Sequence, residues 1–158
     1  MTALLTNILI RQLDKSESAP YELLLDADPS MDAIAKYLPS SETYVALLQE
    51  RIVALFVLYP IDTNTMEIKN IAVEEQLQNK GIGKLLLNKA AQIALDKGAK
   101  SLIIGTSNAS IAQLYLYQKA GFEITGIKHN FFLDNYPEPI FENGIRCMHM
   151  LMLTKNLQ

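Results

Sequence analysis

Cysteine is almost absent from the chain, which has only one, Cys147, in 158 residues. A single thiol cannot form an internal disulfide, so nothing in the composition implies an oxidising compartment. Cys147 lies in the apolar run CMHMLML, where we expect a buried strand residue rather than a nucleophile.

An excess of positive charge is also missing. The chain has 14 lysines and arginines against 17 aspartates and glutamates, which leaves a net charge of −3. This balance argues against nucleic-acid binding driven by bulk charge. It fits a cytoplasmic protein that handles small molecules, and it weakly favours cationic substrates.

Long hydrophobic runs and a leader sequence are missing as well. The longest strongly apolar run, IVALFVLYPI, has about half the length that a membrane span needs. The N-terminus MTALLTNILIRQLDK has no basic segment before its apolar stretch and no small-residue cleavage site after it. We therefore expect no signal peptide and no membrane contact. Because there are also no repeats or linkers, residues 1–158 are predicted to form a single domain.

The first half of the chain predicts a strand, two short helices and a three-stranded meander. The strand Ile8–Leu13 alternates apolar and polar residues, and the second helix has Ser30 as its cap and Pro39 at its end. A tight connection around Glu50 and Arg51 joins two β-rich runs as an antiparallel hairpin. The strands of the meander are predicted at residues 42–49, 51–61 and 65–73.

The second half predicts alternating helices and strands. A helix from Gly81 to about Lys97 follows the meander, and a buried strand comes next at residues 101–106. Strand, helix and strand at this spacing form a right-handed crossover with parallel strands. Another helix has Ser110 as its N-cap and Gly121 just past its end, and strands follow at 122–127 and 145–153. Together these elements predict an α/β fold with a mixed sheet and helices on both faces.

The stretch QLQNKGIGKLLL places glycines where the first of these helices begins, as several phosphate-binding loops do. A P-loop is excluded because Gln78 stands where its first glycine should be and Leu85 where its hydroxyl residue should be. A dinucleotide-binding fingerprint is excluded because Leu86 replaces its third glycine.

A third pattern, Q/R-x-x-G-x-G/A, matches at Gln78, Gly81 and Gly83. Its physics is that of a helix N-terminus, where unpaired N–H groups and the helix dipole attract an anion. Glycine allows the backbone to approach a phosphate closely, and Lys80 and Lys84 add positive charge. Alone, the pattern is equally compatible with a glycine-rich turn that caps a helix.

Two further features, one on each side of the glycine pattern, make it more specific. The strand IKNIAV precedes it, and LYQKAGF follows at residues 116–122. Together they resemble the GCN5-related N-acetyltransferase (GNAT) superfamily, over nearly the whole chain from the first strand through the turn at Gly121 and Phe122. The resemblance implies the acyl-CoA N-acyltransferase fold, a mostly antiparallel sheet of six to seven strands with a splayed central parallel pair.

The resemblance also implies acetyl-CoA as co-substrate, bound between the splayed strands, and no metal. Its pantetheine amides would pair with main-chain groups of Ile71, Ala72 and Val73, and an N–H near Val73 would polarise the thioester carbonyl. Its pyrophosphate would lie on backbone N–H groups of the glycine loop. The loop residues are Gln78, Asn79, Lys80, Gly81, Ile82, Gly83 and Lys84.

Two residues are implied in proton transfer. Tyr117 occupies the position of the family's tyrosine and would be the general acid, although a tyrosine on an amphipathic helix can also be a core residue. Glu67 would be the general base, although it could simply be ion-paired with Lys69. Strand alternation would place Glu67, Lys69, Ile71 and Val73 on one face.

Asn108 is expected to contact the cofactor. Family members often have an asparagine in this region, but the usual spacing to the tyrosine would point to Ser110. The sequence therefore departs from the family pattern by two residues, and Ser110 is expected to cap the helix and could also contact the cofactor.

The acceptor is expected to meet the long loop at residues 131–144. Acidic and aromatic residues alternate there, as suits a cationic amine. They are Asp134, Glu138 and Glu142 among Phe131, Phe132, Tyr136 and Phe141. The loop could equally be a solvated segment, a cover for the sheet edge or a dimer contact. For His129 and His149 we expect structural or surface roles.

These features predict an N-acetyltransferase that transfers the acetyl group of acetyl-CoA to a primary amine of a small, cationic acceptor, through a ternary complex. Acetylation of a protein N-terminus or lysine, and a non-catalytic acetyl-CoA-binding regulatory module, remain as alternatives. The chain could be a monomer or a homodimer. Neither nucleic acid nor membrane is an expected partner.

Overall fold

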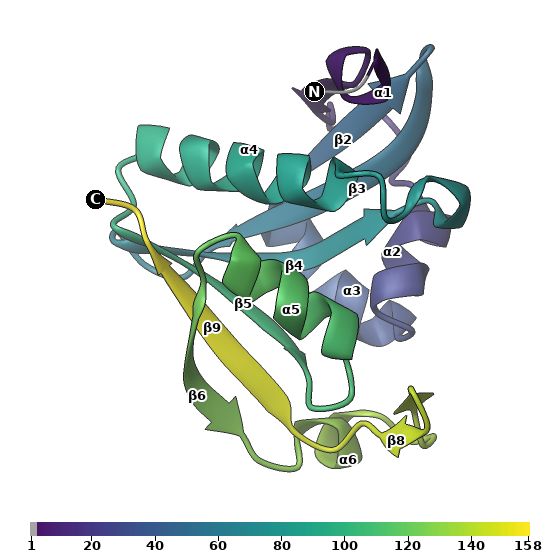
Figure 1. Cartoon of the computed structure of the whole chain (residues 1–158), viewed down its shortest axis with the longest axis vertical. Helices are drawn as coiled ribbons and strands as arrows, with labels where there is room; N and C mark the ends of the chain where they lie inside the picture. Colours follow the sequence, from purple (N-terminus) through teal and green to yellow (C-terminus); the bar gives the residue numbers. More distant parts are fainter. Residues whose placement is uncertain (1–2) are drawn as a thin grey trace.

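A seven-stranded mixed sheet forms the centre of the protein in a computed structural model that describes residues 3–158 (Figure 1). In chain order the strands are β1 (Leu9–Gln12), β2 (Glu42–Leu48), β3 (Arg51–Pro60), β4 (Thr65–Val73), β5 (Ser101–Ser107), β6 (Glu123–Lys128), β7 (Phe141–Glu142), β8 (Ile145–Arg146) and β9 (Met150–Asn156). The order across the sheet is β1-β2-β3-β4-β5-β9-β6, and β7 pairs with β8 in a separate hairpin. Only β4 and β5 are parallel, so the predicted mostly antiparallel sheet is confirmed.

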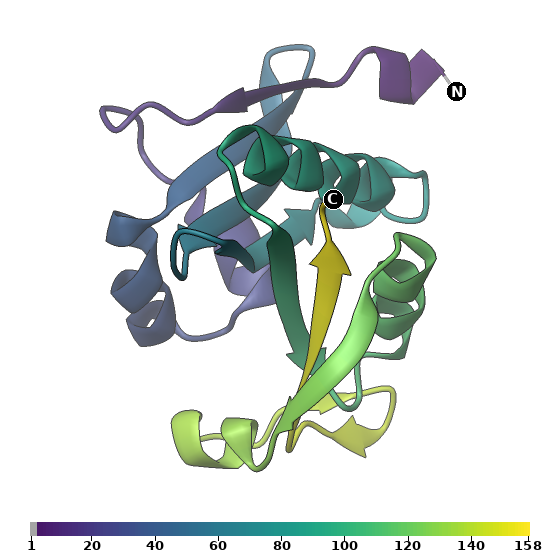
Figure 2. The same cartoon turned by 90° about the vertical axis from the view of Figure 1, so that its left-hand side faces the viewer.

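Helices cover both faces of this sheet, as predicted (Figure 2). The α-helices are α1 (Ala3–Thr6), α2 (Tyr21–Ala27), α3 (Met31–Tyr37), α4 (Ile82–Asp96), α5 (Ile111–Lys119) and α6 (Phe131–Asn135). Two 3₁₀ turns, η1 (Leu38–Ser40) and η2 (Glu75–Leu77), complete the set. The α4 and α5 helices pack on one face of the sheet, and α2 and α3 pack on the other.

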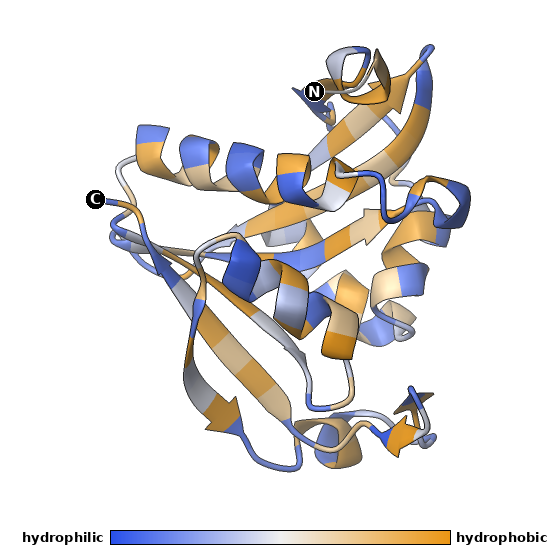
Figure 3. Cartoon of the chain, in the orientation of Figure 1, coloured by the Kyte–Doolittle hydropathy of each residue, from blue (hydrophilic) through white to orange (hydrophobic). Residues whose placement is uncertain are grey.

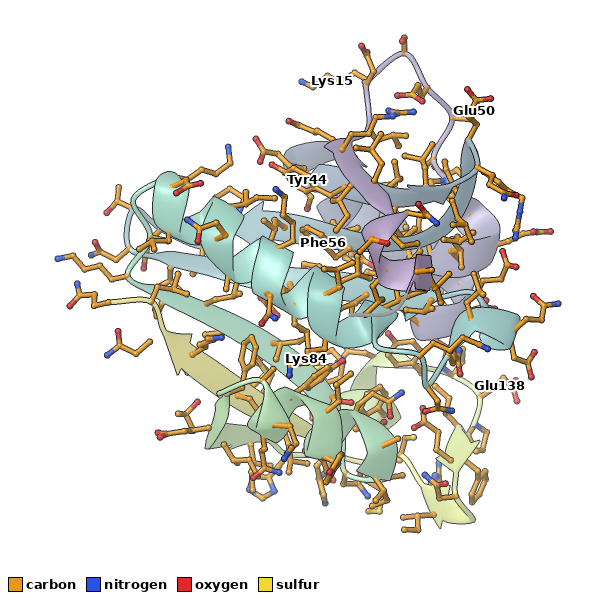
Figure 4. The ribbon with its side chains drawn as sticks, turned by 45° about the horizontal axis from the view of Figure 1, so that its top comes forward. Lys15, Tyr44, Glu50, Phe56, Lys84 and Glu138 are labelled. Carbon is orange, nitrogen blue, oxygen red and sulfur yellow. The ribbon has the colours of Figure 1, made fainter. Side chains whose placement is uncertain are left out.

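Each face has its own hydrophobic core. Phe56 of β3 and Leu86 of α4 are fully buried in the core between α4 and the sheet, where Phe56 stacks on Tyr44 with ring centroids 5.1 Å apart (Figure 4). Leu24 and Ile34 are fully buried on the opposite face. Burial of such a side chain contributes roughly 1.5–3 kcal/mol. The hydropathy pattern of α4, apolar toward the sheet and polar outward, therefore fixes its orientation (Figure 3).

The predicted hairpin and helix cap are both confirmed. The connection between β2 and β3 consists of Gln49 and Glu50, whose φ angles of 51° and 66° are those of a tight hairpin turn. The Ser30 side chain accepts a hydrogen bond from Ala33 N at 3.1 Å, as an N-cap does.

A β-bulge in β4 overturns the predicted strand alternation. Val57 pairs with Asn70 but Leu58 pairs with Ile68, so Lys69 is an extra residue in β4. Because the bulge shifts the alternation by one residue, Glu67 lies on the α2 and α3 face with Asn70. Ile71 and Val73 lie on the opposite face, against α4.

The predicted last strand, residues 145–153, is also corrected. The chain forms β8 in the separate β7–β8 hairpin, has no strand at residues 147–149, and joins the seven-stranded sheet in β9. Asn108 holds the chain at this break, because its Oδ1 accepts hydrogen bonds from Met148 N and His149 N at 2.8 and 3.0 Å. Cys147 is buried as predicted, but it lies outside a strand, and its burial raises the pKa of its thiol.

The central parallel pair separates after four residues, which confirms the predicted splay. The ladder joins Thr65–Ile68 to Ser101–Ile104 and then ends. Beyond it, β4 continues beside β3 and β5 continues beside β9, and the two diverge (Figure 1). We call this divergence the split. Residues 69–73 form its β4 side and residues 105–107 its β5 side.

Candidate active site

Main-chain groups line the β4 side of the split. Glu74 N donates to Val53 O at 2.8 Å, so the N–H of residue 74 points toward β3. Because N–H groups alternate between the two edges of a strand, Ile71 and Val73 present theirs to the split. The same alternation turns the main-chain groups of Ala72 toward β3. Ile71 and Val73 can therefore pair with an extended ligand, whereas Ala72 contributes to the sheet.

The glycine loop turns sharply from the end of β4 into α4. Asn79 and Gly81 both have left-handed backbone angles, with φ of 61° and 94°. The Gln78 side chain donates from Nε2 to Val73 O at 3.0 Å, and this bond ties the loop to the last residue of β4. A Cβ on Gly81 would lie 3.2 Å from Leu5 Cδ1, so both its angle and its surroundings favour glycine.

The first turn of α4 has free hydrogen-bond donors. The first main-chain bond of the helix runs from Leu85 N to Gly81 O at 3.1 Å, so the N–H groups of Ile82, Gly83 and Lys84 have no partner within it. No side chain caps this helix within residues 3–158. With the positive end of the helix dipole added, this turn fits the pyrophosphate of a nucleotide cofactor.

Gly83 has a packing role that the motif alone does not show. A Cβ at this position would lie 3.1 Å from Leu116 Cδ2 of α5. The glycine therefore allows α4 and α5 to approach closely, and α5 carries Tyr117 next to Leu116.

Tyr117 is buried on the α4 face, where its ring packs against Phe122 at a centroid distance of 6.3 Å. Burial, and to a smaller degree the negative charge of Glu142, raises the pKa of its hydroxyl above the ordinary value for tyrosine. The side chain is thus both a core residue, as one interpretation held, and a phenol kept in its protonated form.

Glu142 reaches the N-terminus of α5 from the β7–β8 hairpin. Ser110 Oγ donates to Glu142 Oε2 at 2.6 Å, and Asn143 Nδ2 donates to Ala109 O at 2.9 Å. Ser110 occupies the N-cap position as predicted, but its hydroxyl does not cap the helix because it binds Glu142 instead.

Glu67 is buried and ion-paired with Lys69, whose Nζ lies 3.1 Å from its carboxylate. Lys69 Nζ also lies 5.3 Å from the centroid of the Tyr59 ring. The ion pair that was the structural alternative for Glu67 is therefore present, on the face of β4 that carries α2 and α3.

The side chain of Asn108 is committed to the protein itself. Besides accepting bonds from Met148 N and His149 N, it donates from Nδ2 to Arg146 O at 3.2 Å. Both ends of the amide thus hold the segment between β8 and β9. This geometry favours a structural role, and the cofactor contact expected of Asn108 stays a prediction.

A polar network joins the long loop to the connection between α2 and α3, residues 28–30, which we call the α2–α3 corner. Tyr136 OH donates to Asp28 Oδ1 at 2.8 Å, and Tyr37 OH lies 3.4 Å from Asp28 Oδ2. Asn70 Nδ2 donates to Leu24 O and to Tyr37 OH at 3.0 and 3.1 Å. Asn70 Oδ1 is the only buried side-chain polar atom without a hydrogen bond in the described part of the chain. The network therefore has one unused acceptor, beside the split.

The long loop thus has an attachment at each side of the split. Tyr136 attaches it to the α2–α3 corner, and Glu142 and Asn143 attach it to the start of α5. Of its acidic residues, Glu142 is engaged by Ser110 near Tyr117, while Glu138 is exposed (Figure 4).

Comparison with known proteins decides the family. Residues 7–122 match the model of the "Acetyltransferase (GNAT) family". The chain belongs to the GNAT acetyltransferase family. It is 49% identical over 137 residues to the N-acetyltransferase YvbK of Bacillus subtilis, covering 87% of this chain and 88% of that protein.

Two solved acetyltransferase structures are also similar over most of their length. An acetyltransferase from Elizabethkingia anophelis with acetyl-CoA bound has 53% identity and a TM-score of 0.93, covering 95% of this chain and 98% of that one. A Bacillus subtilis acetyltransferase in complex with CoA has 45% identity and a TM-score of 0.90, covering 96% and 99%. The present GNAT protein is an acetyl-CoA-dependent N-acetyltransferase, with acetyl-CoA as its co-substrate.

Several features of this GNAT site were not predicted. The Ser110 bond to Glu142 and the Tyr136 bond to Asp28 each join the long loop to an element that is far away in the sequence, and the Gln78 bond to Val73 joins the glycine loop to the strand before it. The composition of the long loop hinted at the first two bonds only. Within residues 3–158 no helix is long and apolar enough to cross a membrane, and no cluster of three or more metal-ligating residues occurs.

Proposed function

We propose that this GNAT protein acetylates a primary amine of a small, cationic acceptor by direct attack on acetyl-CoA. The single observation that carries the proposal is the split. One side of it offers main-chain groups and an uncapped helix start, and the other side offers a buried tyrosine.

In this proposal the co-substrate lies along the β4 side of the split. The pantetheine amides pair with Ile71 and Val73, and the Val73 N–H polarises the thioester carbonyl. The pyrophosphate lies on the N–H groups between Gln78 and Lys84, chiefly those of the first turn of α4. What supports this placement is that these donors have no partner in the helix and that the loop is held in position by Gln78.

The chemistry needs a proton acceptor and a proton donor. An alkylamine has a pKa of ~10.4, so on the order of 1 in 10³ molecules is neutral at pH 7. As the amine nitrogen bonds to the carbonyl carbon, its proton passes to Glu67 or to a water relay. As the C–S bond breaks, the departing thiolate takes a proton from Tyr117. The raised pKa of Tyr117 is compatible with the second role, because the phenol then keeps a proton to donate at any pH at which an ordinary tyrosine would, and above.

The acceptor lies between the α2–α3 corner and the long loop in this proposal. Asp28 and Tyr136 meet there, and Asn70 Oδ1 provides a buried acceptor without a partner. Carboxylates and aromatic rings around such a hydrogen-bond acceptor favour a positively charged group. In the substrate this group would be a protonated amine, separate from the amine that attacks the thioester.

Release of free CoA thiol across matched amines tests the proposal. A diamine should react with a higher kcat/KM than the amino alcohol of the same chain length, because only the diamine has a second cation. Faster reaction of peptides that carry a free N-terminus or lysine would favour the protein-acetylation alternative. Tight acetyl-CoA binding without turnover of any amine would contradict the proposal and favour a regulatory module.

A further inference from the structure

The outer strand β6 is exposed along almost its whole length. It forms one edge of the sheet, and every residue except Gly126 is exposed (Figure 2). Ile124 and Ile127 expose 48% and 52% of their surface. An edge strand with unpaired main-chain groups and large apolar side chains is a site where another strand can add.

A bulge in β6 brings these two isoleucines onto one face. Ile124 pairs with Leu153 and Ile127 pairs with Leu151, although the isoleucines are three residues apart. Thr125 is the extra residue that makes this possible. Since Leu153 belongs to the core beneath α4 and α5, both isoleucines lie on that face of the sheet.

The charges of β6 stand at its two ends. Glu123 begins the strand and Lys128 ends it. No ion pair involves either residue within residues 3–158, and Lys128 Nζ lies 5.8 Å from the centroid of the Phe131 ring. When two copies of the strand EITGIK run antiparallel, the glutamate of each copy therefore faces the lysine of the other.

We infer that β6 pairs antiparallel with β6 of a second copy of this chain, about a two-fold axis that passes between Thr125 and Gly126. In this register Glu123 lies opposite Lys128 of the partner subunit, and Ile124 lies opposite Ile127 of the partner subunit. Two-fold symmetry repeats each contact, so the interface has two ion pairs and a cluster of four isoleucines. A shift of one residue would separate both ion pairs and place isoleucines on opposite faces.

The neighbouring helix adds apolar surface on the same side of the sheet. Ile111 and Tyr115 lie one turn apart on α5, which packs beside β6, and they expose 53% and 67% of their surface. A strand pair alone buries little area, so this surface helps the interface reach the size that a stable dimer needs.

Charge reversal with rescue tests the register. Sedimentation velocity over a wide range of concentrations should give the mass of two chains for the natural protein. Glu123→Lys and Lys128→Glu should each raise the dimer dissociation constant about tenfold, because each replaces two attractive pairs by two repulsive ones. The double variant Glu123→Lys/Lys128→Glu should recover the dimer, because the pairs re-form with their signs exchanged.

Lys89→Glu, at an exposed position on α4, is the matched control and should leave the dimer unchanged. Ile127→Asp should give a monomer with normal release of CoA thiol, since Ile127 is not part of the active site. A natural protein that remains monomeric would overturn the inference. An unchanged dimer dissociation constant in both single variants would also overturn it. So would a double variant that does not recover the dimer.

Discussion

The two sides of the split are built from different kinds of group. The β4 side offers main-chain N–H groups of Ile71 and Val73 and of the first turn of α4. The β5 side, with α5 and the long loop, offers side chains, among them Tyr117 and Glu142. Main-chain donors exist whatever the side chain is, so the β4 side should tolerate substitution unless a new side chain blocks the ligand. The β5 side should depend on the identity of each residue.

The largest effect is expected where a side chain would block the β4 side. Gly81→Asp should abolish acetyl-CoA binding, because it adds a Cβ close to Leu5, strains a left-handed residue and places a negative charge at the pyrophosphate. Calorimetric titration with acetyl-CoA measures this. Gly98→Asp is the matched control, since Gly98 has a similar φ of 91° at the other end of α4. Equal acetyl-CoA affinity of both variants would contradict the assignment of the glycine loop as the pyrophosphate site.

On the β5 side, Tyr117→Phe should lower the rate of catalysis and leave acetyl-CoA binding intact, the opposite of Gly81→Asp. We expect kcat to fall roughly 10²–10⁴-fold, as loss of a general acid does, with little change in acetyl-CoA affinity. Because the pKa of Tyr117 is raised, the natural enzyme should stay active to a higher pH than an ordinary tyrosine would allow. Tyr115→Phe, at an exposed position, should have no effect. A large loss of affinity in Tyr117→Phe would make Tyr117 a binding or packing residue.

Glu67→Gln separates a side-chain base from a water relay. If Glu67 accepts the proton, kcat should fall about 10²-fold and recover as the pH rises, because more of the amine is then neutral. A pH profile of kcat measures this. Glu42→Gln, which removes another strand carboxylate that pairs with a lysine, is the control. An unchanged kcat in Glu67→Gln would assign the proton to water.

Glu142→Gln should shift the pH profile of kcat and leave the fold intact. The negative charge of Glu142 helps to raise the pKa of Tyr117, so its removal should lower that pKa. The alkaline loss of kcat should then begin at a lower pH than in the natural enzyme, because Tyr117 must be protonated to act as an acid. Glu138→Gln, an exposed residue of the same loop, should leave the profile in place. No displacement would show that Glu142 and Tyr117 are not coupled.

The smallest effect is expected from the lysines of the glycine loop. Lys80→Ala should weaken acetyl-CoA binding only about two- to fivefold, because an exposed charge adds little to the main-chain donors and the dipole. The measurement is the same calorimetric titration, repeated at high salt, where the difference should shrink. A loss as large as that of Gly81→Asp would show that side chains, not main-chain groups, dominate the β4 side.

Much of this protein follows from local sequence rules. Strand alternation, apolar periodicity, the Ser30 cap and the tight connection expected around Glu50 and Arg51 predict elements whose bounds agree closely with the structure, except for the last strand. The glycine loop, together with the LYQKAGF motif, indicated the family and its co-substrate. These features depend on residues a few positions apart, so a single sequence contains the information needed to predict them.

The remaining features depend on contacts between residues that are far apart in sequence. The bulge at Lys69 moves Glu67 to the other face of β4, and Asn108 holds the segment between β8 and β9. Tyr136 meets Asp28 across 108 positions of sequence. The sequence alone determined most of the central strands and helices, because propensity and spacing act locally, and its two motifs indicated the co-substrate through their resemblance to a family. Only the tertiary structure decided which side chains share a face and which meet at the split, because one inserted residue or one long-range hydrogen bond changes both.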